Sequence, residues 1–252
     1  MAGLAGAQEM DLISVDQLQL DTRLAGVSLS LASGELLGVI GPNGAGKSSL
    51  LECIAGLQPY SGRIELEGEE LSRVETSKRA QRIAFLPQRC QSAWALKVVD
   101  VIALGRLPWG DEDAGLIEKA ARHTGVIEWL DSRVDHLSGG EQARVWLARV
   151  LAGQPDIILA DEPLASLDLH YQQRVLELLR KHTRELGSVI LSIHDLNLAA
   201  HWCDRLVLLD AGRIHAVGTP QQVLTPEAIR QVYQVEAEVD FSGEQPLIRV
   251  LR

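Results

Sequence analysis

The chain contains the stretch Gly41-Pro42-Asn43-Gly44-Ala45-Gly46-Lys47-Ser48-Ser49, directly after the apolar run 36–40. This is the spacing G-x-x-x-x-G-K-[ST] of a loop that cradles phosphate groups with backbone N–H groups, at the positive end of the helix that follows. In such a loop Lys47 places a charge on the β- and γ-phosphates, and Ser48 offers its hydroxyl to Mg²⁺. A glycine turn without a ligand is the alternative. The apolar run before the loop and the apolar positions of 50–57 after it favour a loop in which residues 41–49 bind a nucleotide.

Length and composition are those of a globular protein. The 252 residues can bury a sizeable core in one domain, and 46% hydrophobic with 23% charged residues are ordinary values. The formal net charge of −10 argues against a protein held to nucleic acid by phosphate contacts. Cys53, Cys90 and Cys203 are scattered without metal-ligand spacing, which indicates a reduced, cytoplasmic protein. We expect no signal peptide and no membrane span, so any membrane role requires a partner.

Apolar segments alternate with helical ones along the chain. The pattern predicts strands at 12–15, 27–31, 36–40, 62–67, 82–86, 157–160 and 188–193, and a hairpin at 206–217. Helices are expected after the phosphate loop and at 98–104, 114–123, 125–131, 142–151 and 169–186. Such alternation predicts a largely parallel sheet. The expected fold is α/β, a single P-loop NTPase domain with an antiparallel N-terminal part, a helical subdomain at about 89–153 and a C-terminal extension at 219–252.

Two carboxylates follow the apolar run 157–160. Ligands of parallel α/β sheets lie at the carboxyl ends of the strands, so Asp161 is placed to hold Mg²⁺ directly or through water. Glu162 is placed to orient and deprotonate an attacking water. The alternative is a helix start, which prefers acidic residues. A phosphate loop in the same chain favours the catalytic interpretation.

The segment Leu137-Ser138-Gly139-Gly140-Glu141-Gln142 has two interpretations. Ser138 and Glu141 fit a capping box on the helix that follows. Capping does not explain the two glycines, because each lowers helix propensity. They are explained if an anion approaches the backbone closely.

In this order and spacing, the phosphate loop, the segment 137–142 and the carboxylate pair resemble the ATPase subunits of ABC transporters, over about residues 11–233. The resemblance implies that Gln88 senses Mg²⁺ and the membrane partner, that Ser166-Leu167-Asp168 is the D-loop, and that His194 is the switch histidine on the γ-phosphate. Taken singly, Gln88 would be a surface glutamine, His194 a residue at a helix start and Asp168 a helix cap. Their order after a phosphate loop favours the family.

The resemblance also implies a mechanism with partners. Two copies pack head to tail, each ATP lying between Lys47 and Ser48 of one copy and Ser138, Gly139 and Gly140 of the other. Glu141 and Asp168 are counted with the ATP-binding residues, and Ser48, Gln88 and Asp161 with the Mg²⁺ ligands. Closing on ATP and opening after hydrolysis moves two transmembrane permease subunits, served by a substrate-binding protein. This implies a homodimer on the cytoplasmic face of the inner membrane, and no nucleic acid.

One departure from the family pattern concerns the base. The family usually stacks adenine on an aromatic residue shortly before the second strand, whereas residues 11–35 contain no Phe, Trp or Tyr. Arg23 is the candidate for this role, because a guanidinium stacks on aromatic faces. The departure weakens any inference that the chain selects ATP over other triphosphates.

Three segments resemble importers of metal chelates such as vitamin B12, ferric siderophores and haem: 104–109, 194–200 and the tail from 218 to 233. The segment 22–24 is more similar to the vitamin B12 type, and 235–239 to the siderophore type, so both stay open. Residues 88–110 are expected to form the groove for a permease helix. Trp94 and Trp109 would be exposed aromatics there, or would pack between the insertion and the core.

The sequence fits two other classes of protein less well. A soluble ABC ATPase without a permease usually carries insertions or a duplicated cassette, and this chain has a single one. A P-loop kinase or GTPase would need an acceptor site or a base-specific motif in place of 137–142.

Overall fold

The computed structural model describes residues 11–88, 95–243 and 245–251. Its larger sheet has the strand order β10-β9-β3-β8-β7-β6. Neighbouring strands from β9 to β6 are parallel, and β10 is an antiparallel edge. The strands are β3 (Leu36–Ile40), β6 (Ile83–Leu86), β7 (Ile157–Asp161), β8 (Ser188–Ser192), β9 (Arg205–Asp210) and β10 (Arg213–Gly218). The mostly parallel core sheet is therefore confirmed.

Two smaller antiparallel sheets complete the β-structure of the described residues. The N-terminal sheet has the order β2-β1-β4-β5, and β11 pairs with β12 near the C-terminus. The strands are β1 (Ile13–Leu20), β2 (Leu24–Leu31), β4 (Ser61–Leu66), β5 (Glu69–Glu70), β11 (Ala237–Asp240) and β12 (Leu247–Val250).

Helices occupy most of the remaining described chain. The α-helices are α1 (Lys47–Ile54), α2 (Thr76–Arg82), α3 (Val98–Ala103), α4 (Ala114–Thr124), α5 (Gly139–Ala152), α6 (Leu169–Glu185), α7 (Leu196–Trp202), α8 (Pro220–Val223) and α9 (Pro226–Tyr233). Three 3-10 helices are η1 (Leu104–Trp109), η2 (Ile127–Trp129) and η3 (Val134–His136).

The parallel sheet separates two hydrophobic clusters. Because side chains alternate along a strand, β3 sends Leu36 and Ile40 to one face and Leu37 and Val39 to the other. The first face packs against residues of α6, α7, α8 and α9. The second packs against α1 and the N-terminal sheet. Both faces of β3 are covered, which explains why its sequence is an unbroken apolar run.

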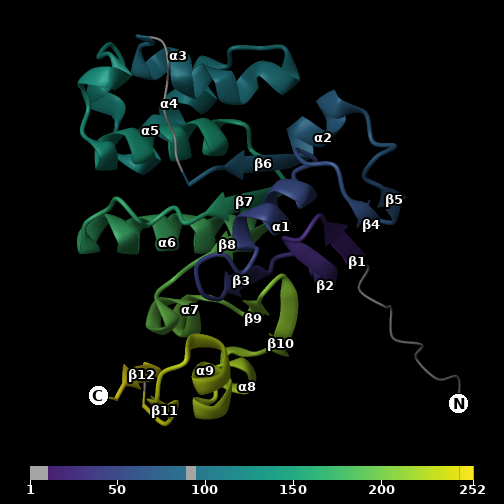
Figure 1. Cartoon of the computed structure of the whole chain (residues 1–252). Helices are drawn as coiled ribbons and strands as arrows, with labels where there is room; N and C mark the ends of the chain where they lie inside the picture. The colour runs from purple at the N-terminus through teal and green to yellow at the C-terminus, as the bar shows by residue number, and fades with distance from the viewer. Residues whose placement is uncertain (1–10, 89–94, 244, 252) are drawn as a thin grey trace, which may run out of the picture.

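The helical part has a hydrophobic cluster of its own. Buried residues between Val98 and Ala152, from α3, α4, α5 and the turns between them, pack together. In Figure 1 these helices lie at one end of the molecule, while α8, α9 and the β11–β12 pair lie at the other. The N-terminal sheet lies to one side of the parallel sheet (Figure 1).

The structure differs from the sequence-based expectation in places. Residues 125–131 form only the short η2, because Gly125 ends α4 in the left-handed conformation (φ 68). α5 begins at Gly139 rather than at 142, since Ser138 caps it. α2 was not expected, and it buries none of its residues, so it carries no apolar periodicity. Trp94 lies outside the described residues.

The packing of η1 on α5 provides a test of stability. A Cβ on Gly105 would lie 2.0 Å from the carbonyl oxygen of Arg149 in α5. Because this contact is with backbone, Gly105→Ala should lower the free energy of unfolding by about 2 kcal/mol. Gly115→Ala is the control, since the nearest atom to its Cβ is a side-chain oxygen of Asp113 at 3.2 Å. Urea denaturation should show a lowered midpoint for Gly105→Ala, whereas Gly115→Ala, within helix α4, should keep or raise it. An unchanged midpoint for Gly105→Ala would contradict the proposed packing.

Candidate functional site

The phosphate loop joins the buried end of β3 to the first turn of α1. Gly46 stands at the N-cap of α1 with φ 104, and no side chain accepts a hydrogen bond from the helix start. A Cβ on Gly46 would lie 2.8 Å from the carbonyl oxygen of Arg23, so only glycine fits against the β1–β2 turn. The first N–H groups of α1 therefore lack a side-chain partner, which is the arrangement that attracts an anion.

Lys47 lies at the mouth of this loop. Its Nζ donates hydrogen bonds to the carbonyl oxygens of Gly41 at 2.9 Å and Pro42 at 3.1 Å. Burial lowers the pKa of the ammonium, and the carboxylates of Glu162 and Asp161 act in the opposite direction. The charge is thus held in a poorly hydrated position between the loop and two acidic residues, where a phosphate would be a strong partner.

Asp161 and Glu162 lie at the carboxyl end of β7, and one serine holds both. Ser192, which is fully buried at the end of β8, donates its hydroxyl to Asp161 Oδ1 at 2.6 Å. The hydroxyl oxygen of Ser192 also accepts the backbone N–H of Glu162 at 2.8 Å. Sequence reasoning missed Ser192, although its position at the end of a buried strand beside Asp161 was a usable signal.

Gln88 and His194 converge on Glu162 from two other strand ends. Gln88 Nε2 donates to Glu162 Oε2, and the Nε2 of His194 hydrogen bonds to Glu162 Oε1. Gln88 follows β6 and His194 follows β8, so neighbouring strands of one sheet deliver all three side chains. The carboxylate of Glu162 is therefore held at both oxygens.

Helix α7, which follows His194, is hydrogen bonded to the β11–β12 pair near the C-terminus. Asp195 caps α7 by accepting the N–H groups of Asn197 at 2.8 Å and Leu198 at 3.0 Å. Asn197 in turn accepts the N–H of Ile248 in β12 at 2.7 Å and donates to its carbonyl oxygen at 3.2 Å. The position of α7 thus depends on a strand far along the chain.

Lys47, Gln88 and Glu162 open onto one cavity of about 410 Å³, whereas Asp161 and His194 are not part of its described lining. Arg23 lines it, on the turn between β1 and β2, with its guanidinium 3.2 Å from the carboxylate of Asp21. The described lining is Arg23, Asn43, Gly44, Gly46, Lys47, Ser48, Ser49, Gln88 and Glu162. The cavity brings together Arg23, the phosphate loop, Gln88 and Glu162, four features that the sequence had singled out separately.

Residues 138–141 do not line this cavity in the described part of the chain. They form the start of α5, where Ser138 N donates to Glu141 Oε2 at 2.8 Å and Glu141 N donates to Ser138 Oγ at 3.4 Å. The Ser138 hydrogen bonds lower the pKa of the Glu141 carboxyl. The capping box is confirmed. A Cβ on Gly139 would meet no neighbouring described atom within 4 Å, so the missing side chain leaves the helix start open.

Asp168 is likewise a helix cap within this chain. It accepts the N–H of Tyr171 at 2.9 Å at the start of α6. The loop before it contacts the start of α5, since a Cβ on Gly140 would lie 3.0 Å from the carbonyl oxygen of Ser166. The start of α5 and the loop before Asp168, neither of which lines the cavity, therefore contact each other.

Among the helices of residues 11–88, 95–243 and 245–251, none combines the length and apolar character that crossing a membrane requires.

Comparison with protein families matches the chain to the ABC transporter family over residues 24–165. The hemin import ATP-binding protein HmuV of Bordetella avium is 45% identical over 230 residues, 86% of this chain and 88% of that protein. HmuV of Pseudomonas fluorescens is 44% identical over 238 residues, 90% and 93% of the two chains. The cobalamin import ATP-binding protein BtuD of Halobacterium salinarum is 40% identical over 240 residues, 90% of this chain and 60% of that protein.

Solved structures give the same fold. CbiO1 of Clostridium perfringens, part of the ABC transporter complex CbiONQ, superimposes with a TM-score of 0.75 at 26% identity, covering 88% of this chain and 94% of that one. A transporter assigned to the metal-chelate type, in an inward-facing conformation, gives a TM-score of 0.80 at 24% identity, covering 96% and 97%. The chain therefore belongs to the ABC transporter family, as an ATP-binding subunit that hydrolyses ATP.

Proposed function

We propose that this chain energises an importer for a metal chelate, as a homodimer beneath two permease subunits on the cytoplasmic face of the inner membrane. The observation that carries the proposal is the division of the site: Lys47, Ser48 and Glu162 share one cavity, whereas 138–141 lie outside it. A second copy can supply the missing half. The relatives import hemin and cobalamin, which are both metal chelates, and this favours an importer over a soluble ABC ATPase.

Residues 41–49 hold the triphosphate in this proposal. The uncapped start of α1 and the ammonium of Lys47 bind the β- and γ-phosphates, and release of the Gly41 and Pro42 carbonyls frees Lys47 to do so. Arg23 lines the same cavity and is the group we propose for the base.

Mg²⁺ would be held by Ser48, Gln88 and Asp161 together with the phosphates. These residues offer hydroxyl, amide and carboxylate oxygens, the ligands that Mg²⁺ prefers. Mg²⁺ is commonly bound through one or two protein ligands together with substrate phosphates. When bound, the ion supplies neutralisation of phosphate charge.

Glu162 is the proposed general base, and His194 and Gln88 position it. Each carboxylate oxygen accepts one of these contacts and keeps a second lone pair, which would accept a proton from the attacking water. In the proposal, His194 also contacts the γ-phosphate and Gln88 also contacts Mg²⁺. Ser138, Gly139, Gly140, Glu141 and Asp168 act on the ATP of the second copy.

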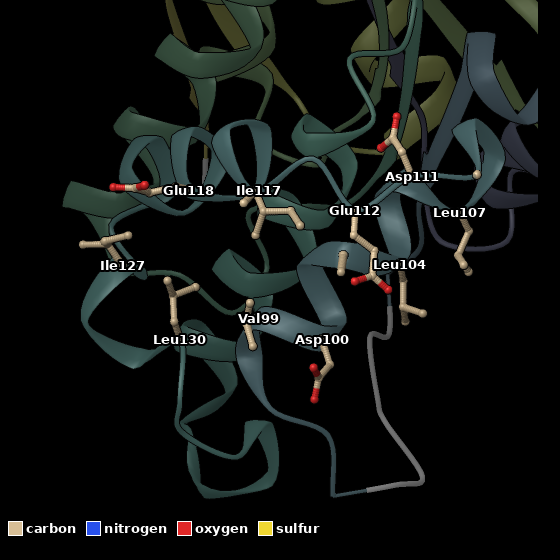
Figure 2. A pocket seen from close by; sticks show the side chains of 13 residues that line it. Val99, Asp100, Leu104, Leu107, Asp111, Glu112, Ile117, Glu118, Ile127 and Leu130 are labelled. Carbon is tan, nitrogen blue, oxygen red and sulfur yellow. The ribbon is translucent and has the colours of Figure 1, made fainter.

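A surface groove on the helical part is the proposed contact with a permease. Its volume is about 1000 Å³, and it is lined from α3, η1, α4 and η2 by residues between Val99 and Leu130. Figure 2 shows Val99, Ile117, Ile127 and Leu130 around the hollow. The described lining runs from Val99 to Leu130, so the groove extends past residue 110, the end of the predicted segment.

The charge around this groove indicates the chemistry of its occupant. Asp100, Asp111, Glu112 and Glu118 line it, and the described lining contains no lysine or arginine (Figure 2). Asp111 is paired with Arg106 and Glu118 with Arg122, so the acidic character of the groove rests mainly on Asp100 and Glu112. Buried Arg106 binds Asp111 through both carboxylate oxygens and lowers its pKa, which fixes the rim. A permease segment with apolar side chains and basic flanks would complement it. Trp109 lies near this face, 44% exposed, with its indole N–H donating to the Gly153 carbonyl oxygen at 3.0 Å.

Along the chain, we propose one ABC ATPase domain with a helical subdomain at about 89–153 and an extension at 219–252. The cluster of buried side chains between Val98 and Ala152 supports the first boundary. Packing of α8, α9 and β12 on the main core supports treating the extension as part of the same domain.

Glu162→Gln tests the catalytic centre. ATP binding should persist, whereas phosphate release should fall by about 10²- to 10⁴-fold, because the general base is lost. An ATP-dependent dimer should accumulate in light scattering. Glu177→Gln, exposed on α6, is the matched control and should turn over at the normal rate. Near-normal hydrolysis by Glu162→Gln would contradict its role.

The cargo can be tested by uptake. A strain lacking the gene should lose uptake of labelled hemin, cobalamin or ferric siderophore, and the wild-type gene but not Glu162→Gln should restore it. The chelate that is lost identifies the cargo. Normal uptake of all three would contradict the assignment to metal chelates.

Leu107→Glu tests the groove. Leu107 is 68% exposed, so the change should not destabilise the fold, but a carboxylate there disrupts the apolar contact that the groove offers to a permease segment. We expect loss of chelate uptake in cells, with ATP hydrolysis by the isolated chain within about twofold of normal. Leu186→Glu, at a position 53% exposed and outside the groove, is the control. Normal uptake with Leu107→Glu would remove this face from the interface.

A further inference from the structure

Arg144 is a buried cation on α5, two turns after the capping box at Ser138. Only 6% of the residue is exposed. Its guanidinium carbon lies 3.9 Å from the centre of the Tyr171 ring and 4.6 Å from the centre of the Trp129 ring. One of its N–H groups donates to the Gly125 carbonyl oxygen at 3.3 Å. Its charge lies against the two rings, and the Glu141 carboxylate, one turn earlier on α5, interacts with it electrostatically.

The two rings belong to different parts of the molecule. Tyr171 is on the first turn of α6 and packs against the cluster on the main sheet. Trp129 is in η2 and packs against the cluster of the helical part. Arg144 therefore stands at the boundary between the two hydrophobic clusters and contacts both.

The contact between Arg144 and Tyr171 lies beside the start of α5 and the loop before Asp168, the two segments that do not line the cavity at the phosphate loop. Tyr171 N donates to Asp168, which fixes the start of α6 to the loop before it. Gly140, one helical turn before Arg144, abuts the carbonyl of Ser166 in that loop. A shift of α5 relative to α6 would change both the Arg144–Tyr171 contact and the Gly140–Ser166 contact.

We propose that Arg144, held between Tyr171 and Trp129, is a positioning residue that fixes the segment 138–141 relative to the Asp168 loop of the same chain. The position of residues 138–141 relative to the Asp168 loop determines how readily these two segments close on the ATP bound to a second copy. The inference rests on the proposed function, because it concerns the half of the site that acts across the dimer. Arg144 itself touches no nucleotide.

The physical reason is the shape of the guanidinium. It is planar, so both of its faces can lie against rings at once, and it is less strongly hydrated than an ammonium. Lysine would keep the charge at this position but could not present two flat faces. Arg144→Lys therefore separates stacking from charge.

The test measures ATP-driven dimerisation in the Glu162→Gln background, where hydrolysis does not remove the complex. The variants Arg144→Lys and Tyr171→Leu are compared with the parent, and Tyr171→Phe is the matched control that keeps the ring face. Light scattering during an ATP titration gives the concentration for half-maximal dimer. ATP binding to the monomer is measured at protein concentrations too low for dimerisation.

We expect Arg144→Lys and Tyr171→Leu to raise the half-maximal ATP concentration about tenfold, the size of a desolvated cation–π contact. Tyr171→Phe should stay within about twofold, and ATP binding to the monomer should not change in any variant. An unchanged dimerisation midpoint in Arg144→Lys and Tyr171→Leu overturns the inference. So does a parallel loss of ATP affinity in the monomer, which would indicate a general structural role. A parent that stays monomeric with ATP would instead contradict the two-copy site of the proposed function, and the inference with it.

Discussion

The parallel pairing of β3, β8 and β7 is the constraint on which the rest of the site depends. Ser192 of β8 is level with Val39 of β3 on one side and with Asp161 of β7 on the other. Just past this row the chain enters the phosphate loop, the Glu162 turn and the His194 segment. A parallel sheet brings these three segments to one edge although they are far apart in the sequence. A shift of one residue in the pairing of β7 with β8 would separate Ser192 from Asp161 and the backbone of Glu162.

Electrostatics at this edge favour a bound anion. The first turn of α1 has no side-chain cap, and Lys47 is buried, with its ammonium hydrogen bonded to loop carbonyls. Glu162 and Asp161 raise the pKa of Lys47 and so favour its charged form. The same two carboxylates are the ones that would contact the attacking water and Mg²⁺. The loop carbonyls and the carboxylates thus already compensate the charge of Lys47, and a nucleotide exchanges one set of polar contacts for another.

The sequence predicted the parts of the site that are encoded locally. Residues 41–49, the pair at 161 and 162, and the capping box at 138 are recognisable because spacing along the chain determines their geometry. Ser192 was missed because its role comes from register with a neighbouring strand. The Arg144 contact was missed because its two rings arrive from η2 and α6. In the fold, α2 was missed because none of its residues is buried, so no periodic pattern marks it.

The hydrogen bonds between Asn197 and Ile248 mean that a chain can contain every recognisable motif and still lack a contact on which the fold around the site depends. The two residues lie 51 positions apart, and every segment used to recognise the family precedes Ile248. A gene shortened by a frameshift after residue 240 would still encode the phosphate loop, both acidic residues and His194. Its product would leave the amide of Asn197 without its backbone partner, beside the histidine that faces Glu162. Surveys that count such genes as intact from their motifs would therefore overestimate the number of functional copies.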